Sequence, residues 1–237
     1  KPMFTVPKEF LDDKQLELML KEISFLLYKI FKFVDKKNHI IFKLNNFMTF
    51  SKSEVDKLGD KIRLNAKNIS FDTILELQQY RTLHQVPLSN IFNILCSLTH
   101  NKKGSTIATY RLKRFESIIN KLERFPKMRF NRMWDIAGCR IIVEREEEVS
   151  YIVEKIIGDK RLNVRKINDY IKEKNDDGYK SVHIYAELVD SNLPIEIQIR
   201  TNEQHNWATL VEITDLIYKT RLKEIGKKDN EDLYKFH

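Results

Sequence analysis

Apolar residues recur at intervals of three and four along the first hundred positions, the spacing of one face of a helix. The pattern is present in four segments: residues 8–34, 51–62, 71–85 and 89–100. Ser51 or Ser53 suits the N-cap of the second segment. Pro87 interrupts the pattern, so we expect a helix break there. We therefore predict that residues 1–104 form a helical N-terminal region.

After Pro126 the pattern changes to short segments rich in β-branched residues, as expected for strands. There are four of them: residues 135–143, 163–171, 181–188 and 194–201. Helical spacing returns at 146–158 and in the closing segment 202–225. Residues 105–237 are therefore predicted to form a mixed α/β (α+β) domain with at least four strands and a C-terminal helix.

The last of these strands has two contrasting faces. In "PIEIQIR" three isoleucines alternate with Glu196, Gln198 and Arg200. Successive side chains of a strand point to opposite faces, so one face is apolar and the other carries an acid, an amide and a base. Such a polar face either meets only water, as in many half-buried antiparallel strands, or lines a site.

The charge of the chain is uneven. Lys and Arg outnumber Asp and Glu by 42 to 34, a formal net charge of +8. Residues 1–135 hold 25 basic and 14 acidic side chains, and the remainder holds 17 and 20. A basic surplus favours an anionic partner, although a mild surplus also occurs in proteins that bind none.

Several functional classes are not supported. None of the six glycines stands in a GxxxxGK[ST] or GxGxxG motif, which excludes a P-loop and a Rossmann dinucleotide site. No His precedes an Asp, and HExxH and GxSxG are absent. Cys96 and Cys139 form no CxxC pair, which favours a reducing cytoplasm over a disulfide or zinc framework. No apolar run approaches the roughly 18 residues of a membrane span.

Two acids are candidate metal ligands. Asp135 opens the first apolar strand after Pro126, and Glu196 lies on the last. Carboxylates from neighbouring strands can share Mg²⁺ through oxygen ligands when the ion also holds substrate phosphates. The alternative for Asp135 is a structural acid at the start of a strand, a position that Asp favours.

Other candidate residues are basic or aromatic. Arg111, Ser117 and Lys121 are spaced close to helical turns, with Lys113 beside Arg111. This stripe either presents cations to a polyphosphate or is a solvated helix face. Gly178 precedes Tyr179, with His183 four residues on. An exposed Tyr179 can stack a nucleobase, and the alternative is a hairpin turn with a packed tyrosine.

The order of these motifs resembles the synthetase domain of the RelA/SpoT alarmone synthetases. The chain reads R-x-K-x-x-x-S-I-x-x-K, D-I-A-G-x-R, D-Y-I…G-Y-x-S-x-H, E-I-Q-I-R-T and W-A…Y-K between Arg111 and Lys219. The resemblance is to the small members, which lack a hydrolase domain. It implies a nucleotidyltransferase-like fold with a mixed sheet flanked by helices, and transfer of the β,γ-diphosphate of ATP to a 3′-hydroxyl.

The resemblance also implies roles for single residues. Asp135 and Glu196 would hold Mg²⁺, and Glu196 would help to deprotonate the attacking hydroxyl. Tyr179 would stack the acceptor base with His183 beside it. The residues implied in ATP binding are Arg111 and Arg140 around the adenine, Lys113, Ser117 and Lys121 at the phosphates, and Gln198 in support. His205 and Glu212 match the family more loosely. Diphosphate transfer depends on neutralising charge and aligning the reactants, which agrees with these roles.

One departure concerns the acceptor. Members that use GDP or GTP usually carry lysine and proline just before an asparagine–glycine–tyrosine turn, whereas this chain reads "KEKNDDGY". Asp176 and Asp177 there would repel a 5′-diphosphate. A subgroup of small members acts as toxins on the 3′ CCA end of tRNA, and the basic first half would suit tRNA phosphates. We therefore expect tRNA as acceptor, with GDP or GTP as the alternative.

Further expectations accompany this assignment. Lys52, Lys57, Lys61 and Lys67 are candidate RNA contacts. An antitoxin protein and a homo-oligomer are possible partners, and no membrane partner is expected. A non-catalytic domain that binds nucleotides or a partner is the remaining alternative, and retention of both candidate metal acids argues against it.

Overall fold

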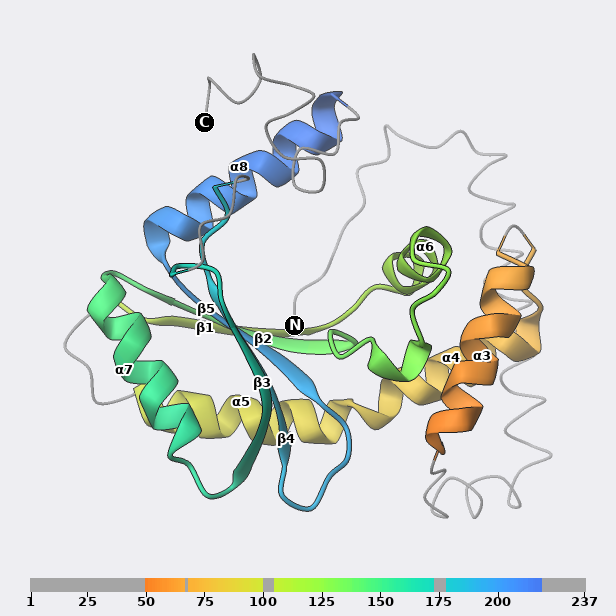
Figure 1. The fold of residues 1–237 in the computed structure, drawn as a ribbon, viewed down its shortest axis with the longest axis horizontal. Helices are drawn as coiled ribbons and strands as arrows, with labels where there is room; N and C mark the ends of the chain where they lie inside the picture. Colours follow the sequence, from red (N-terminus) through yellow and green to blue (C-terminus); the bar gives the residue numbers. More distant parts are fainter. Residues whose placement is uncertain (1–49, 67, 100–104, 173–177, 219–237) are drawn as a thin grey trace, which may run out of the picture. The chain divides into compact units, whose positions relative to one another are not determined.

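The computed structural model describes residues 50–66, 68–99, 105–172 and 178–218, all within one compact unit (Figure 1). The predicted helix at 8–34 lies outside these residues. The centre is a five-stranded mixed sheet in the order β1-β2-β5-β4-β3. Its strands are β1 Ile107–Leu112, β2 Ala137–Val143, β3 Leu162–Asp169, β4 Val182–Leu188 and β5 Ile195–Thr201. β2 and β5 run parallel, and the other neighbours are antiparallel.

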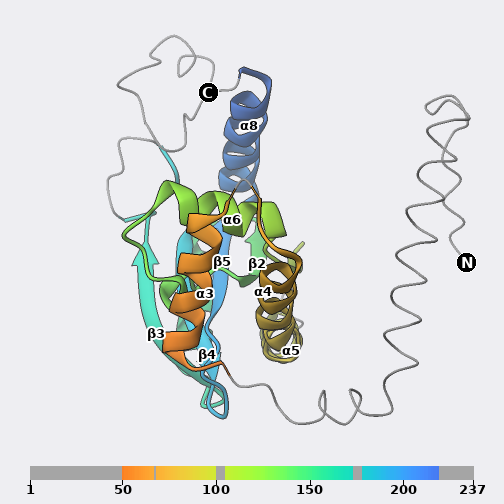
Figure 2. The same ribbon diagram turned by 90° about the vertical axis from the view of Figure 1, so that its right-hand side faces the viewer.

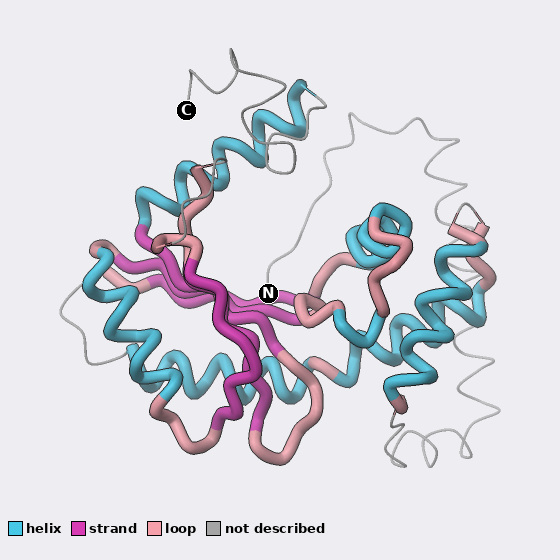
Figure 3. Tube along the Cα trace, viewed as in Figure 1, coloured by secondary structure: helices cyan, strands magenta, loops and turns pink. Residues whose placement is uncertain are grey.

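One face of the sheet is covered by α5 (Gln85–Thr99) and α7 (Glu146–Ile157). Side chains from both helices form one core with the alternating apolar residues of the strands, and the three isoleucines of β5 are fully buried there. Figure 3 shows α6 and α8 on the other side of the strands. The polar residues of β5 face that side, so the predicted two-faced strand is confirmed.

A second core holds the helices beside the sheet. It joins α3 (Lys52–Leu64), α4 (Phe71–Leu83), α6 (Phe115–Arg124) and the 3₁₀ turn η1 (Phe130–Arg132) (Figure 2). Ile118 and Leu122 of α6 are fully buried in it. The side chain of Ser51, one of the two predicted candidates, caps α3 by accepting a hydrogen bond from the Glu54 amide.

Three details of the sequence prediction are wrong. The helix break falls at His84, and Pro87 lies in the first turn of α5, where a missing amide hydrogen removes no intrahelical bond. Arg111 is on strand β1, which was not predicted as a strand, so it shares no helical stripe with Ser117 and Lys121. β2 begins at Ala137, two residues after Asp135.

The helical character of the described residues before 100 is confirmed. The division of the chain at residue 104 stays a prediction. α5, which falls before that boundary, nevertheless shares its core with the sheet. Within the described ranges no helix is long and apolar enough to cross a membrane.

The strand register brings the candidate residues together. Pairing across the sheet places Arg111 opposite Gly138, Gly138 opposite Glu196, and Glu196 opposite Tyr185. The adjacent row pairs Arg140 with Gln198 and Gln198 with His183. Residues that are up to 87 positions apart in the chain therefore lie in two neighbouring rows on the polar face.

Candidate active site

Asp135 and Glu196 line the same pocket, which has a volume of about 280 Å³. Its other lining residues include Arg111, Lys113 and Arg140. Glu196 is carried by β5, and Asp135 directly precedes its neighbour β2. The predicted pair of carboxylates on neighbouring strands is thus brought to one place.

Two lysines neutralise Asp135. The Nζ atoms of Lys113 and Lys121 each lie 2.8 Å from its Oδ2. Lys121 points to the sheet because the opposite side of α6 is buried in the second core. Burial raises the pKa of Asp135, but the two lysines outweigh it, so the pKa is held below its usual value. The Asp135 carboxylate is therefore stabilised in its ionised form.

Three donors surround Glu196. His183 Nδ1 and the Tyr185 hydroxyl each lie 3.1 Å from its Oε1, and Gln198 Nε2 lies 2.9 Å from its Oε2. Burial raises the pKa of Glu196 and the charge of Asp135 adds to this. The hydrogen bond and charge interaction with His183, and the hydrogen bond from Tyr185, lower the pKa. These effects outweigh the first two, so the pKa of Glu196 lies below its usual value.

Two arginines border the pocket. Arg111 is exposed on edge strand β1, and Arg140 is half-buried on β2. Arg140 donates from Nε and Nη2 to Gln198 Oε1, each at 3.3 Å. Burial and then the charge of Arg111 lower the pKa of Arg140, which indicates that the two cations are close. Their guanidinium planes are available for stacking on a base.

Gly138 keeps the floor of this pocket open. A Cβ at this position would lie 3.3 Å from the Glu196 backbone oxygen and 4.0 Å from Glu196 Oε2. A larger side chain would therefore stand beside the carboxylate and fill the space between Arg111 and Glu196. Ser117, the remaining predicted phosphate ligand, lies on the first turn of α6, one turn before Lys121.

The predicted acceptor residues Tyr179 and His183 contact each other. The Tyr179 hydroxyl lies 2.7 Å from His183 Nε2, and both rings make edge contacts with Tyr170. Tyr179 is half-buried rather than fully exposed. Gly178 has a φ of 72°, and its backbone packs on Trp207. Asp176 and Asp177 lie outside the described residues.

The sequence reading missed some neighbours of Glu196. Tyr185 donates to Glu196, and Trp134 makes an edge contact with Tyr185 at a centroid distance of 5.6 Å. The alternation in "SVHIYAEL" places Tyr185 on the same face as His183, which was a usable signal. Which strand lies beside Tyr185 depends on the sheet order, so its partner was not predictable.

The loosely matched residues lie on α8 (Asn202–Tyr218). His205 Nδ1 is 2.8 Å from Nη2 of Arg200, whose side chain is buried and whose Nε has no partner within the described residues. Burial, followed by the charges of Arg200 and Arg140, lowers the pKa of His205. Glu212 interacts with both arginines. These residues border the polar face beside Arg140 rather than the carboxylate pair.

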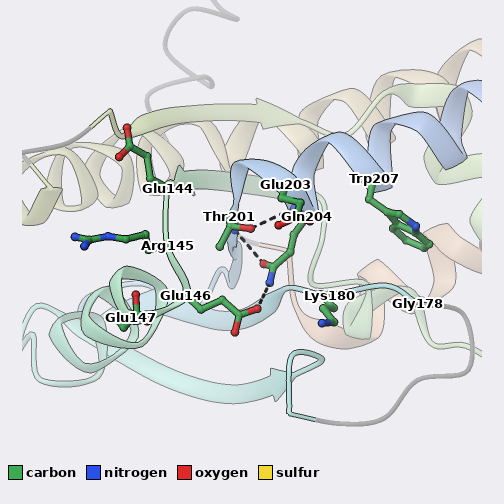
Figure 4. A pocket seen from close by; sticks show the side chains of 10 residues that line it. All are labelled: Glu144, Arg145, Glu146, Glu147, Gly178, Lys180, Thr201, Glu203, Gln204 and Trp207. Atoms are coloured by element: carbon green, nitrogen blue, oxygen red, sulfur yellow. Dashed lines mark hydrogen bonds between the residues drawn. The ribbon is translucent and has the colours of Figure 1, made fainter. Parts of the chain in front are cut away.

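A larger pocket of about 550 Å³ lies at the start of α7 and α8 (Figure 4). Gln204 crosses it, donating to Glu146 Oε1 at 2.8 Å and pairing with Thr201. Its charged lining comprises four glutamates, Arg145 and Lys180. This excess of acid is unsuited to a polyphosphate, so the smaller pocket at Asp135 and Glu196 is the better candidate active site.

The donor set fits Mg²⁺. Asp135 Oδ1 is buried and has no hydrogen-bond partner among the described residues, and Glu196 supplies further carboxylate oxygens. No cluster of three His, Cys, Asp or Glu suited to a metal occurs in the described part of the chain. Mg²⁺ sites often use one or two carboxylates and complete their coordination with substrate phosphates and water.

The fold and the residues of this site are those of a known protein family. Residues 110–223 match the family model described as the region found in RelA / SpoT proteins. The small alarmone synthetase 2 from Bacillus subtilis superimposes with a TM-score of 0.52 and 30% identity, covering 62% of this chain and 82% of that one. The chain belongs to the RelA/SpoT family.

Curated relatives agree with this assignment. Two GTP pyrophosphokinases of Bacillus subtilis (strain 168), YwaC and YjbM, are 34% and 31% identical over 125 and 124 residues. The matches cover 48% and 49% of this chain, and the chain spans only about 60% of the length of these relatives. The pppGpp-bound small alarmone synthetase 1 from the same species, at 20% identity and a TM-score of 0.54, supports the fold alone.

Proposed function

We propose that this protein transfers the β,γ-diphosphate of ATP to a 3′-hydroxyl and releases AMP. The observation that carries the proposal is the pocket in which Lys113 meets Asp135, with Glu196 and Arg140 in the same lining. Lys121 of α6 binds the same Asp135 oxygen from beside this pocket. Phosphoryl-type transfer depends chiefly on positioning and charge stabilisation, and this pocket supplies both.

The donor half of the pocket lies over β1 and β2. Arg111 and Arg140 hold the adenine between their planar groups. Lys113 and Lys121, with Ser117, hold the phosphates. In the described structure both lysines are bound to Asp135, so they are already placed beside the carboxylate near which the phosphates would lie. Charge-assisted contacts of this kind are the strong ones for phosphate groups.

The acceptor half lies over β4. Tyr179 stacks the acceptor base, and His183 orients Glu196. Glu196 takes the proton of the 3′-hydroxyl as its oxygen forms a bond to the β-phosphorus. The bond between that phosphorus and the oxygen bridging to the α-phosphorus breaks, and AMP leaves with the electron pair. The lowered pKa of Glu196 keeps it ionised, so it is present as the base.

Asp135 and Glu196 would hold Mg²⁺, which supplies charge neutralisation for the diphosphate when it is bound. The Oδ1 atom of Asp135 supports this role because it is buried without a partner among the described residues. Lys113 and Lys121 remain the protein's own cations at the same position.

For the acceptor we propose the 3′ CCA end of tRNA, which would make the protein a toxin that blocks translation. The basic surplus before residue 135 and the absence of the usual lysine–proline pair before the turn support this acceptor. An antitoxin partner would be required by the host cell. GDP or GTP is the second candidate, and the name GTP pyrophosphokinase of both curated relatives favours it.

The test is incubation with γ-labelled ATP and Mg²⁺ plus GDP, GTP or deacylated tRNA. We expect AMP release and label on the tRNA. Label on GDP or GTP with unlabelled tRNA would support the proposed reaction but show that the acceptor is a guanosine nucleotide and not tRNA. No AMP release with any acceptor would overturn the proposed reaction, leaving a binding domain without turnover.

A further inference from the structure

Two adjoining pockets lie beside the candidate active site, and neither is lined by the donor residues Arg111 and Arg140. The first, of about 270 Å³, is lined by Lys121, Arg132, Trp134, Asp135, Lys166 and Tyr185. The second, of about 830 Å³, lies between α3 and η1 and includes Lys52, Lys57 and Arg129. Arg132 and Trp134 line both pockets, so the two are continuous at these residues.

Two of the cations in these pockets are available for a ligand. Within the described ranges the side chains of Arg132 and Lys166 form no ion pair or hydrogen bond, and both are exposed. The acids of the second pocket are engaged: Asp56 accepts from Asn131 at 2.6 Å and pairs with Arg129 at 3.9 Å. Asp60 pairs with Arg63 at 2.7 Å. The unpaired charge along the pockets is therefore positive.

The aromatic residue at the junction suits a base. Trp134 is half-buried and contacts Tyr185, whose hydroxyl donates to Glu196. An aromatic ring among cations that follow a groove is the usual arrangement for single-stranded nucleic acid, because every base has a stacking face and every nucleotide a phosphate. Neither Trp134 nor Arg132 belongs to the family motifs in this chain.

We propose that these two pockets are the path of a single-stranded RNA acceptor on the 5′ side of its reacting 3′ end. This inference rests on the proposed diphosphate transfer. The terminal nucleotide extends from Tyr179, which stacks its base, to the first pocket beside Tyr185. The preceding base stacks on Trp134, and the phosphates meet Lys166 and Arg132. The strand continues toward Lys52 and Lys57. A mononucleotide fills only the first pocket and has no preceding base to stack on Trp134, so the stack on Trp134 and the second pocket distinguish the two kinds of acceptor.

The structure also separates the lysines that are expected to contact RNA. Lys52 and Lys57 line the second pocket, whereas Lys61 is bound to Glu76 at 3.0 Å. Lys67 lies outside the described residues. Lys57→Gln and Lys61→Gln, on the same helix, therefore form a matched pair of test and control variants.

The first experiment measures transfer of label from γ-labelled ATP to adenosine, to the trinucleotide CpCpA and to a CCA-ended RNA hairpin. Trp134→Ala should lower kcat/KM about tenfold for the two RNAs while changing that for adenosine less than twofold, given the usual strength of base–aromatic stacking. Trp134→Phe should retain more activity than Ala. Lys57→Gln should weaken hairpin labelling, and Lys61→Gln should not.

The second experiment measures binding without turnover. Trp207→Phe leaves Trp134 as the single tryptophan of the chain. Its fluorescence should be quenched by CpCpA but much less by adenosine at the same concentration. Arg132→Ala should reduce the slope of log K against log salt for the hairpin by about 0.7, the loss of one phosphate contact to a single strand.

The outcomes separate the two proposals. Equal losses for adenosine and CpCpA in Trp134→Ala, with no selective quenching, would overturn the RNA path and leave diphosphate transfer intact. Efficient labelling of GDP or GTP by the wild type, with neither RNA labelled nor bound, would overturn the path together with the tRNA acceptor. Absence of AMP release with every acceptor would overturn the reaction, and selective quenching would then still support the path as a binding site.

Discussion

His183 donates to Glu196 from Nδ1 across 3.1 Å, while its other ring nitrogen lies 2.7 Å from the Tyr179 hydroxyl. A neutral imidazole satisfies both contacts when the Nδ1 proton goes to the carboxylate and Nε2 accepts from the tyrosine. The acceptor residue Tyr179 is thereby connected to the proposed base through one ring. Ordering of Tyr179 by a bound base would fix the orientation of His183 and of Glu196.

Removal of either carboxylate charge should abolish most of the transfer. Asp135→Asn and Glu196→Gln are each expected to lower kcat by about 10²-fold or more, the typical loss for a preorganised charge-stabilising group. Circular dichroism should show that both variants fold, because neither changes side-chain size. Near-normal turnover of either variant in the presence of Mg²⁺ would remove that residue from the site.

The stability of the fold should depend on pH through Asp135. The pKa of Asp135 in the folded protein lies below the ordinary value of 3.8. Its ionised form therefore stabilises the fold fully above pH 3.8, and this contribution is lost as the pH falls through the folded-state pKa. Urea unfolding should therefore find Asp135→Asn less stable than the wild type at pH 7. The difference should shrink below the ordinary pKa.

The control for this measurement is Asp190→Asn, which changes an exposed loop acid without an ion pair in the described part of the chain. It should show little difference from the wild type at any pH. A gap between wild type and Asp135→Asn that stays constant down to pH 3 would mean that the lysine pair is not the source of the stabilisation.

Arg111 should be replaceable by lysine only in part. Lysine keeps the charge but lacks the flat guanidinium, so Arg111→Lys should raise the KM for ATP at unchanged net charge. Steady-state kinetics with varied ATP at saturating acceptor checks this. If the lysine variant equals the wild type while Arg111→Ala is impaired, the arginine acts as a charge near the phosphates and does not stack the adenine.

A side chain at Gly138 should impair ATP binding because it would occupy the pocket, and not because the backbone there requires glycine. Gly138→Val places branched carbons beside the Glu196 carboxylate in the space between Arg111 and Glu196. We expect about a tenfold or greater loss of ATP affinity, because misplacement at the reacting centre is costly. Gly158→Val, at the end of α7, is the control for general effects on folding and should bind ATP normally.

Tyr179 should affect the acceptor and not the donor. Tyr179→Ala is expected to lower transfer strongly, because base stacking contributes about 1–3 kcal/mol per base. Tyr179→Phe keeps the ring but loses the hydroxyl that contacts His183, so its activity should lie between those of Ala and the wild type. Equilibrium binding of ATP should be nearly unchanged in both, and a large loss there would place Tyr179 in the donor pocket or the fold.

The sequence by itself predicted much of the candidate site. The alternation in "PIEIQIR" was sufficient to predict a buried apolar face and a polar face because side-chain direction in a strand has a period of two. Motif order was sufficient to name the candidate residues, including Asp135 and Glu196. Helical spacing predicted α7, and the two candidate caps Ser51 and Ser53 predicted the start of α3 to within two residues, because both signals are local.

Only the tertiary structure decided which of these residues meet. Arg111 was assigned to a helical stripe because its neighbours have helical spacing, whereas pairing with β2 makes that segment an edge strand. The contacts of Asp135 with Lys121, of Glu196 with Tyr185, and of Trp134 with Tyr185 join separate elements. They depend on the strand order and on the packing of α6 against α3 and α4. These are long-range relationships, and no local pattern of the chain encodes them.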